Sequence, residues 1–526
     1  MKEVHEWTLE QKAVLEHAKS FPNKRSEMRA NPPSSIMVEA LAGSGKTTVM
    51  CEFARSLPSY CIVEALAFNK LIAKELAAQM PEGVNCRTFS SLGYGVWRNY
   101  TGLKKLDLKK WKIQDIYKTL GLGGIRETFP DLARIISLAK AAGMNPCLAD
   151  DAPQQYMTES AAEEWIYLAE QQDLTFGKKG GSITQERAIE ACRQVLAESC
   201  VQAIQGQIDF DDMLYMPALW GGKFPSPDVV IVDEFQDVSS IQNALISKML
   251  GKYGILVAVG DRHQSIYAFR GAGHGAIPDG IRQFKCKQLP LSVTFRCGKM
   301  IAEEAAQIVP TLKTLHDQHM GEVLPEGKWN HETVKVGDAI LCRNNAPLVD
   351  ICLSLIAKRV PAKILGNDIG KGLKKILSDL DTDNLLVIPD RLHNYESKKV
   401  AEFTKKGQFG MAQRLEDRCQ ALRLIIYTFD AGNDSLKDVE ELIDSMFSDE
   451  TPLVTLCSIH KSKGREWDRV FFLDSHLIPS KYAQTSEALQ QEDNLRYVGI
   501  TRAKNCLHYV SSASFGGVDV EEGKGE

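Results

Sequence analysis

The sequence predicts an α/β protein with two cores, each built on a parallel sheet and each carrying a mainly helical insertion. Two observations lead to this prediction. Apolar runs such as Val229–Val232 and Ile255–Val259 lack alternation, which is typical of strands that are covered on both faces. Strand signals then disappear at 99–205 and at 370–450, where helical periodicity replaces them.

The domain organisation follows from this alternation. A chain of 526 residues is too long for one core, since domains average about 150 residues. We expect the first core at 1–98 and 206–286, its insertion at 99–205, the second core at 287–369 and 451–512, a short insertion at 370–450, and a disordered acidic tail at 513–526.

Composition excludes several classes of protein. No apolar run approaches the ~20 residues that cross a bilayer, so no membrane association is expected. The 13 cysteines include no C-x-x-C pair, which argues against a zinc ribbon and for a reducing compartment. We expect the cytoplasm of a bacterial or phage-infected cell, or a eukaryotic nucleus. The net charge of −5 still allows a local basic groove for nucleic acid.

A glycine-rich loop, Ala40-Leu-Ala-Gly-Ser-Gly-Lys-Thr47, lies between a predicted strand and a predicted helix. Its small residues allow backbone N–H groups to face a phosphate, and the helix N-terminus favours negative charge. Lys46 is expected to reach the β- and γ-phosphates, and Thr47 to hold Mg²⁺. The residues expected to bind the nucleotide here are Ala42, Gly43, Ser44, Gly45, Lys46, Thr47 and Thr48.

Acidic residues follow a buried strand in Val229-Val-Ile-Val-Asp-Glu-Phe-Gln-Asp237. The carboxyl ends of parallel strands form the ligand-binding edge of such sheets. We expect Asp233 to hold the Mg²⁺ shell and Glu234 to orient and deprotonate the attacking water.

These and later motifs resemble, in order, those of the UvrD/Rep/PcrA-type superfamily 1A DNA helicases. The matching strings are Leu9–Gln11, Phe68–Lys70, Thr88–Leu92, Asp233–Asp237, Gly260–Ala272, Leu291–Cys297, Ser458–Trp467 and Gln491–Ala503. Phe68-Asn-Lys together with Cys86-Arg-Thr-Phe is also similar to the F-box DNA helicase branch. Departures from the family pattern are Ser90, Ser458 and Arg465.

The resemblance implies two RecA-like P-loop NTPase cores that bind ATP and Mg²⁺. It implies that Gln264 senses the γ-phosphate and that Arg296 and Arg502 neutralise its developing charge when the cores close. It further implies that Gln11 reads adenine, that Phe295 stacks on the base and that Glu466 contacts the sugar or nucleotide edge.

The resemblance also implies a set of DNA contacts. Stacking on aromatic side chains suits movement along any sequence, because every base has a π-face. The expected contact residues are Phe68, Asn69, Thr88, Tyr267, Phe269, Arg270, Arg343, Ser458 and His460. For His460, a satisfied buried histidine is the alternative.

The leading interpretation is an ATP-dependent translocase on single-stranded DNA that unwinds duplex DNA 3′→5′ in repair or replication. One alternative strips proteins from single strands, in the manner of an anti-recombinase. Another is a nucleotide-gated DNA-binding switch, against which the complete hydrolytic set argues. A small-molecule kinase and an RNA track are less favoured. We expect a monomer with replication or recombination proteins as partners, and neither a large swivelling insertion nor a nuclease domain.

Overall fold

The computed structural model describes residues 6–122, 132–146, 162–170, 184–266, 275–358, 360–365, 367–405, 409–429, 434–446 and 454–516. The chain divides into two compact units, Met1–Ser292 and Val293–Glu526. Both are α/β units with parallel sheets, which confirms the predicted fold class. Among the helices within the described ranges, none is long and apolar enough to cross a membrane.

The first unit is centred on a six-stranded parallel sheet with the order β3-β2-β6-β7-β1-β8. Its strands are β1 (Ile36–Ala40), β2 (Val63–Ala67), β3 (Asn85–Thr88), β6 (Val229–Val232), β7 (Ile255–Gly260) and β8 (Lys287–Leu291). Every residue of β2, β6 and β7 is buried. This burial explains the continuous apolar sequences of β6 and β7, because both faces of the sheet are covered.

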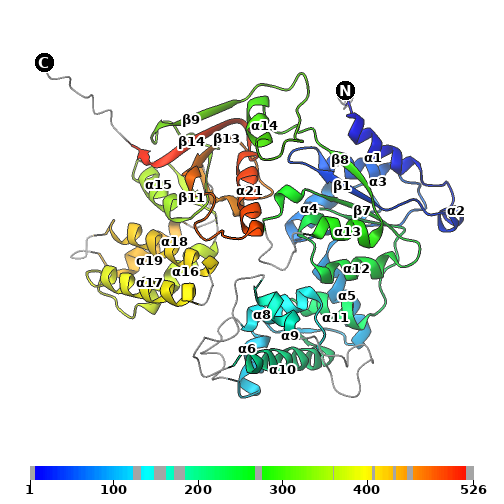
Figure 1. Cartoon of the computed structure of the whole chain (residues 1–526), viewed down its shortest axis with the longest axis horizontal. Helices are drawn as coiled ribbons and strands as arrows, with labels where there is room; N and C mark the ends of the chain where they lie inside the picture. Colours follow the sequence, from blue (N-terminus) through cyan, green and yellow to red (C-terminus); the bar gives the residue numbers. More distant parts are fainter. Residues whose placement is uncertain are drawn as a thin grey trace. The chain divides into compact units, whose positions relative to one another are not determined.

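Helices cover both faces of this sheet (Figure 1). The cluster on one face includes residues of α1 (Leu9–Lys19), α3 (Lys46–Ser56) and α4 (Lys70–Gln79). The cluster on the other includes residues of α5 (Phe89–Thr101), α12 (Ser240–Leu250) and α13 (Ala276–Phe284). A short α2 (Arg25–Ala30) also belongs to this unit.

Strand β8 shows that the first core extends beyond the expected boundary at 286. We expected 287 to begin the second core, but Lys287–Leu291 pairs in parallel with all of β1. The sequence Lys-Gln-Leu-Pro-Leu is a weak strand signal because Pro290 has no N–H to donate. Such a strand is tolerated at the edge of a sheet, and β8 is the terminal strand here.

The insertion of the first unit is helical, as its sequence predicts. Its described elements are β4 (Asp107–Leu108), α6 (Lys112–Thr119), α8 (Leu132–Ala142), α9 (Ala162–Glu170), α10 (Gln185–Ile204) and β5 (Gln207–Ile208). The chain then returns through α11 (Asp212–Trp220), whose Tyr215 and Met216 lie in the same apolar cluster as residues of α5 and α12. The insertion is therefore joined to the sheet by continuous packing.

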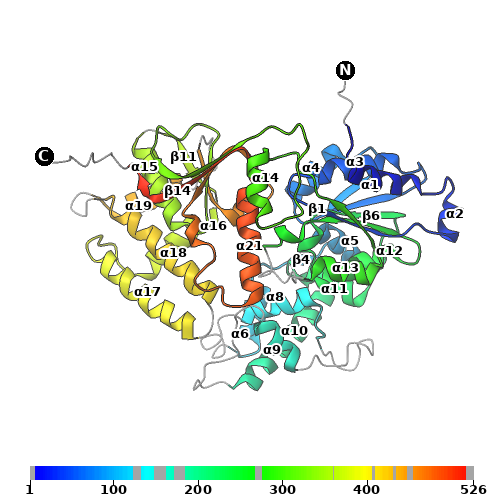
Figure 2. The ribbon, with the colours of Figure 1, turned by 45° about the horizontal axis from the view of Figure 1, so that its top comes forward.

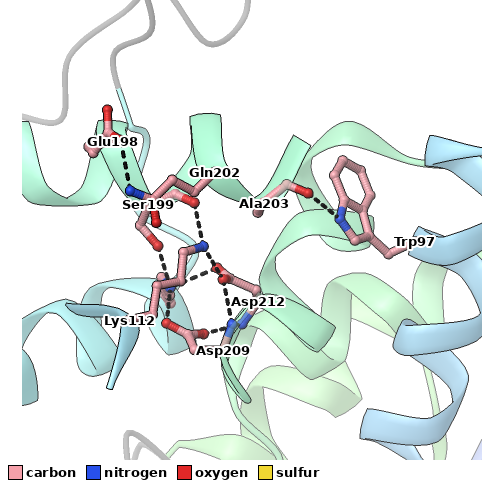
Figure 3. Close-up of polar contacts among 9 residues, drawn as sticks. Trp97, Lys112, Glu198, Ser199, Gln202, Ala203, Asp209 and Asp212 are labelled. Atoms are coloured by element: carbon pink, nitrogen blue, oxygen red, sulfur yellow. Dashed lines mark hydrogen bonds and ion pairs between the residues drawn. The ribbon is translucent and has the colours of Figure 1, made fainter. Parts of the chain in front are cut away.

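A cluster of buried charges lies inside this insertion (Figure 3). The Asp212 carboxylate accepts from Lys112 Nζ at 2.6 Å and from Lys140 Nζ at 2.7 Å. Lys140 also donates to Asp209 at 2.7 Å and to the Ser199 hydroxyl at 2.9 Å. These side chains come from α6, α8, α10 and the start of α11, so the cluster ties four segments together.

The pKa values of Lys112, Lys140 and Asp212 are shifted by burial and by their contacts with one another. Burial lowers the pKa of Lys112, which has one carboxylate partner at hydrogen-bond distance. Burial acts in the same direction on Lys140, but the Asp212 and Asp209 carboxylates outweigh it and raise the Lys140 pKa. Burial raises the pKa of Asp212, yet the two ammonium groups hold it below its usual value. Lys112, Lys140 and Asp212 thus shift one another's pKa values inside the insertion.

The second unit contains another six-stranded sheet, with the order β11-β12-β10-β13-β14-β9. Its strands are β9 (Glu322–Trp329), β10 (Ala339–Cys342), β11 (Ala362–Ile364), β12 (Val454–Ser458), β13 (Trp467–Leu473) and β14 (Ala503–Phe515). Its helices are α14 (Lys299–Ala306), α15 (Ala346–Ala357), α16 (Asn367–Asp379), α17 (Ile388–Lys405), α18 (Phe409–Ile426), α19 (Leu436–Met446), α20 (Ile459–Ser462) and α21 (Ser486–Ile500). Helices α16–α19 cover most of the region in which the sequence predicts a short helical insertion (Figure 2).

The C-terminal strand continues further than expected. We predicted a disordered tail from 513, but β14 continues to Phe515. The Phe515 ring packs edge-on against Trp329 at a centroid distance of 4.7 Å, and Gly516 N–H donates to the Trp329 carbonyl. This aromatic contact fixes residues 513–515, which the sequence predicted to be part of a disordered tail. The rest of the predicted tail lies outside the described residues.

We predict that Asp212→Asn destabilises the first unit by about 3–5 kcal/mol, because it leaves a buried ammonium group without a compensating charge. The measurement is the urea midpoint of the first unfolding transition, monitored by tryptophan fluorescence. The control is Asp107→Asn, which removes an exposed ion pair with Lys109 in the same insertion. Equal midpoints for wild type and Asp212→Asn would show that the cluster contributes no stability.

Candidate functional site

Strand order brings three loops of the first unit together. Strands β6, β7 and β1 are neighbours and run parallel, so the loops that follow them leave the same edge of the sheet. These loops carry the glycine-rich sequence after β1, the acids after β6 and the Gly260-Asp-Arg-His-Gln string after β7. The carboxyl edge of a parallel sheet is where such folds bind ligands.

The glycine-rich loop has the backbone that a phosphate cradle requires. Gly43 and Gly45 have φ angles of 72° and 80°, a region that side-chain-bearing residues rarely adopt. The Leu41 N–H donates to the Leu291 carbonyl at 2.9 Å, which anchors the loop to β8. Helix α3 begins directly afterwards at Lys46. The buried Ser44 hydroxyl has no protein hydrogen-bond partner within the described ranges. These features fit a bound phosphate.

Gln11 is held against this loop. Its side chain is buried, and its Nε2 donates to the Ser44 carbonyl at 3.2 Å. Its Oε1 accepts from the Thr8 backbone, while the Thr8 hydroxyl accepts from Gln11 N–H, so the pair forms a capping box at the start of α1. The helix cap therefore fixes the predicted adenine-reading side chain beside the phosphate loop.

The two acids after β6 have different environments. Asp233 is buried, and its Oδ1 accepts from the Glu234 N–H at 2.8 Å. Glu234 is half-buried and has a φ of 53°, a left-handed conformation that costs energy for a residue with a Cβ. Strain of this kind is often found at active sites, so the conformation supports a functional role for Glu234.

A polar network connects the loops after β6 and β7. Gln236 Nε2 donates to the Glu234 carboxylate, and Gln236 Oε1 accepts from Asp261 N–H at 2.9 Å. The Asp261 carboxylate accepts from Gln264 Nε2 at 2.7 Å and lies 3.9 Å from Lys46 Nζ. The predicted base, phosphate sensor and phosphate-binding lysine thus belong to one connected group of side chains.

The predicted Mg²⁺ residues come from two of these loops. Thr47 lies in the first turn of α3 and Asp233 directly after β6. Within the described ranges, no group of three or more His, Cys, Asp or Glu side chains is arranged to hold a metal ion by itself. A hydroxyl and one carboxylate fit Mg²⁺, which is usually bound by few protein ligands together with substrate phosphates.

Two of the residues predicted to contact the nucleotide from the second unit lie at the amino ends of its strands. Glu466 directly precedes β13, and Arg502 precedes β14, which is the neighbouring strand. Glu466 pairs with Arg296 at 2.6 Å and with Lys504 at 2.9 Å. Burial raises the pKa of Glu466, but these two cations hold it below its usual value. Phe295, which precedes Arg296, is half-buried. The buried Arg502 guanidinium donates to the backbone carbonyls of Arg465 and Val498.

The predicted DNA contacts of the first unit lie at the carboxyl ends of β2 and β3, towards the other end of the same sheet edge. Phe68 is partly exposed, and its ring lies 5.8 Å from that of Phe89. Asn69 and Thr88 cap α4 and α5 through their side-chain oxygens. Their positions agree with a surface separate from the phosphate loop. The other predicted contacts of this unit, Tyr267, Phe269 and Arg270, lie outside the described residues.

The predicted DNA contacts of the second unit gather at the carboxyl edge of its sheet. Cys342 and Ser458 are paired residues at the ends of β10 and β12, so Arg343 and His460 leave the sheet close together. Arg343 forms a bidentate ion pair with the buried Glu492, with a shortest distance of 2.8 Å. Burial, followed by the charge of Arg343, lowers the pKa of His460 to about 3. His460 itself is only half-buried, and its contact with DNA stays a prediction.

Sequence reasoning missed four residues of interest. Gln236 and Asp261 both lie inside the quoted motifs, but only the folded structure shows that they connect two loops. Trp111 and Phe210 are 59% and 61% exposed on the insertion, which is unusual for large aromatic residues. Lys110 Nζ lies 5.0 Å from the Trp111 ring centre, and the lysine-rich turn around it was the available signal.

Comparison with known proteins agrees with this arrangement. Residues 22–285 match the model of the UvrD/REP helicase N-terminal domain, and residues 397–514 match that of the UvrD-like helicase C-terminal domain. F-box DNA helicase protein 1 of Schizosaccharomyces pombe is 26% identical over 94% of this chain and 58% of its own length.

Two further relatives cover a similar share of this chain. F-box DNA helicase 1 of Gallus gallus is 23% identical over 90% of this chain and 47% of its own length. ATP-dependent DNA helicase UvrD2 of Mycobacterium tuberculosis (strain ATCC 25618 / H37Rv) is 23% identical over 92% of this chain and 78% of its own length. The chain thus spans about half the length of the F-box relatives.

The depressed pKa of His460 predicts a specific pH dependence of stability. An unfolded histidine binds a proton below about pH 6.5, whereas folded His460 resists protonation down to about pH 3. Its contribution is therefore present above about pH 6.5 and is lost as the pH falls towards 3. We expect His460→Gln to lose less thermal stability than wild type between about pH 7.5 and 5. Equal losses would show that His460 titrates normally.

Proposed function

Because the chain belongs to the UvrD/Rep helicase family, we propose that it is an ATP-driven translocase on single-stranded DNA that unwinds duplex DNA with 3′→5′ polarity. The observation that carries this proposal is the shared sheet edge of the first unit. The loops after β1, β7 and β6 supply a phosphate cradle, a sensor and acids, respectively. The carboxyl ends of β2 and β3 carry Phe68, Asn69 and Thr88. Nucleotide and DNA sites on one rigid sheet can affect one another.

Hydrolysis of ATP at the nucleotide site of the first unit requires little covalent chemistry from the protein. Glu234 takes a proton from water as the water oxygen bonds to the γ-phosphorus, and the bond to the β-phosphate oxygen breaks to release ADP. Lys46 and the loop N–H groups bind the phosphates, and Gln264 orients the reacting group. A Mg²⁺ ion held by Thr47 and Asp233 would offset negative charge on the phosphates. By resemblance to the family, Arg296 and Arg502 would add further positive charge.

The 3′→5′ polarity rests on the resemblance of the string Gln264–Ala272 to the 3′→5′ branch of the family. Protein displacement from single strands uses the same motor and stays an alternative. A nucleotide-gated switch is less well supported. A switch needs nucleotide binding, but it does not need the strained Glu234 conformation or the contacts that connect it to Gln264.

We predict that Glu234→Gln lowers the turnover of ATP by ~10²–10⁴-fold while ATP-dependent binding of single-stranded DNA persists, because the amide cannot accept the proton. Turnover is measured as phosphate release, and DNA binding by fluorescence anisotropy. Glu52→Gln is the control, since Glu52 lies on α3 and pairs with Arg55 away from the acids after β6. Retained turnover in Glu234→Gln would remove Glu234 as the base.

Duplexes with one single-stranded tail test the polarity. We expect ATP-dependent strand separation of the duplex with a 3′ tail and little separation of the duplex with a 5′ tail. Lys46→Ala is the control for dependence on ATP. Preference for the 5′ tail would contradict the assigned polarity. Streptavidin displacement from a biotinylated single strand, without separation of either duplex, would favour the protein-stripping alternative.

A further inference from the structure

Gln236 occupies a buried position between the proposed base and the loop that carries Gln264. It lies on the single 3-10 turn Phe235–Asp237 that follows Glu234, and its side chain is 2% exposed. Phe235 anchors this turn, because its fully buried ring packs against Gly280 of α13. The turn therefore has a fixed position relative to the sheet.

The two ends of the Gln236 amide have different partners. The Asp261 N–H can only donate, so the Gln236 oxygen faces it, at 2.9 Å. The amide nitrogen then faces the Glu234 carboxylate, to which it donates. A carboxyl group in place of this amide could satisfy Asp261 but would set an acceptor against an acceptor at Glu234. The partners thus require an amide of this length.

The space around Gln236 allows little adjustment. A Cβ atom added at Gly260 would lie 2.6 Å from Gln236 Oε1 and 3.1 Å from its backbone nitrogen, so β7 approaches the turn as closely as glycine permits. Asp261, which donates its N–H to Gln236, is 1% exposed, and its carboxylate accepts from Gln264 Nε2. Movement of the loop after β7 would therefore displace the Gln236 side chain.

We propose that Gln236 is a positioning residue that sets the orientation of the Glu234 carboxylate according to the position of the Asp261–Gln264 loop. The proposal rests on the proposed function, since it takes Glu234 as the base and Gln264 as the phosphate sensor. Gln236 touches neither water nor phosphate in this role. It makes the geometry of the base depend on the same loop that contacts the nucleotide, so that hydrolysis follows correct engagement of the γ-phosphate.

The test is Gln236→Glu, which keeps the size of the side chain and the acceptor for Asp261 but replaces the donor to Glu234. We expect kcat for ATP in the presence of single-stranded DNA to fall by about tenfold to a hundredfold, the loss typical of a misplaced reacting group. KM for ATP and the affinity for single-stranded DNA stay within about twofold of wild type, since the phosphate cradle and DNA contacts are unchanged.

The matched control is Gln242→Glu on the same segment. Gln242 is also buried, but its Oε1 accepts from Ser239 N–H in a capping box that glutamate satisfies equally well. Its kcat is expected to match wild type. If Gln236→Glu does not fold, Gln236→Asn replaces it, because the shorter amide cannot reach both partners.

An unchanged kcat in Gln236→Glu, or equal losses in kcat and in the affinities for ATP and DNA, would overturn the positioning role. Failure of the proposed function is a separate outcome. It would appear in the wild-type protein as ATP turnover that does not respond to DNA, before any Gln236 variant is made.

Discussion

Parallel pairing of buried strands is the constraint on which the rest of the structure depends. Every strand of the first sheet leaves its following loop at the same edge, so residues 40–47, 233–237 and 260–264 meet there although they are far apart in the sequence. In the second sheet the same rule separates two sets of residues. Arg343, Ser458 and His460 lie at the carboxyl edge, whereas Glu466 and Arg502 lie at the amino ends of β13 and β14.

Those parts of the molecule with strong local signals could be predicted from the sequence. The apolar runs of β6 and β7 specify buried strands because no residue on either face meets water. The positive-φ glycines of the phosphate loop, Gly43 and Gly45, were recognisable because few other residues adopt that backbone. Family comparison confirms the UvrD/Rep likeness that the ordered motifs indicated.

Features that depend on distant partners could not be predicted. Strand β8 contains a proline and is defined only by its pairing with β1, and Phe515 is ordered only by its contact with Trp329. The local sequence does not indicate that Lys112 and Lys140 are buried, because their shared partner Asp212 lies 100 and 72 residues further along the chain. Gln236 looked like an ordinary member of its motif, because its role depends on Asp261, which is 25 residues away in the sequence.

We propose above all that the carboxyl edge of the first sheet is an ATP-hydrolysing site that responds to DNA. Steady-state ATPase activity, measured with and without single-stranded DNA in wild type and in Lys46→Ala, tests it most directly. We expect strong stimulation by DNA in the wild type and loss of turnover in the variant. A wild-type rate that does not change with DNA would contradict the translocase and favour a switch or an RNA track.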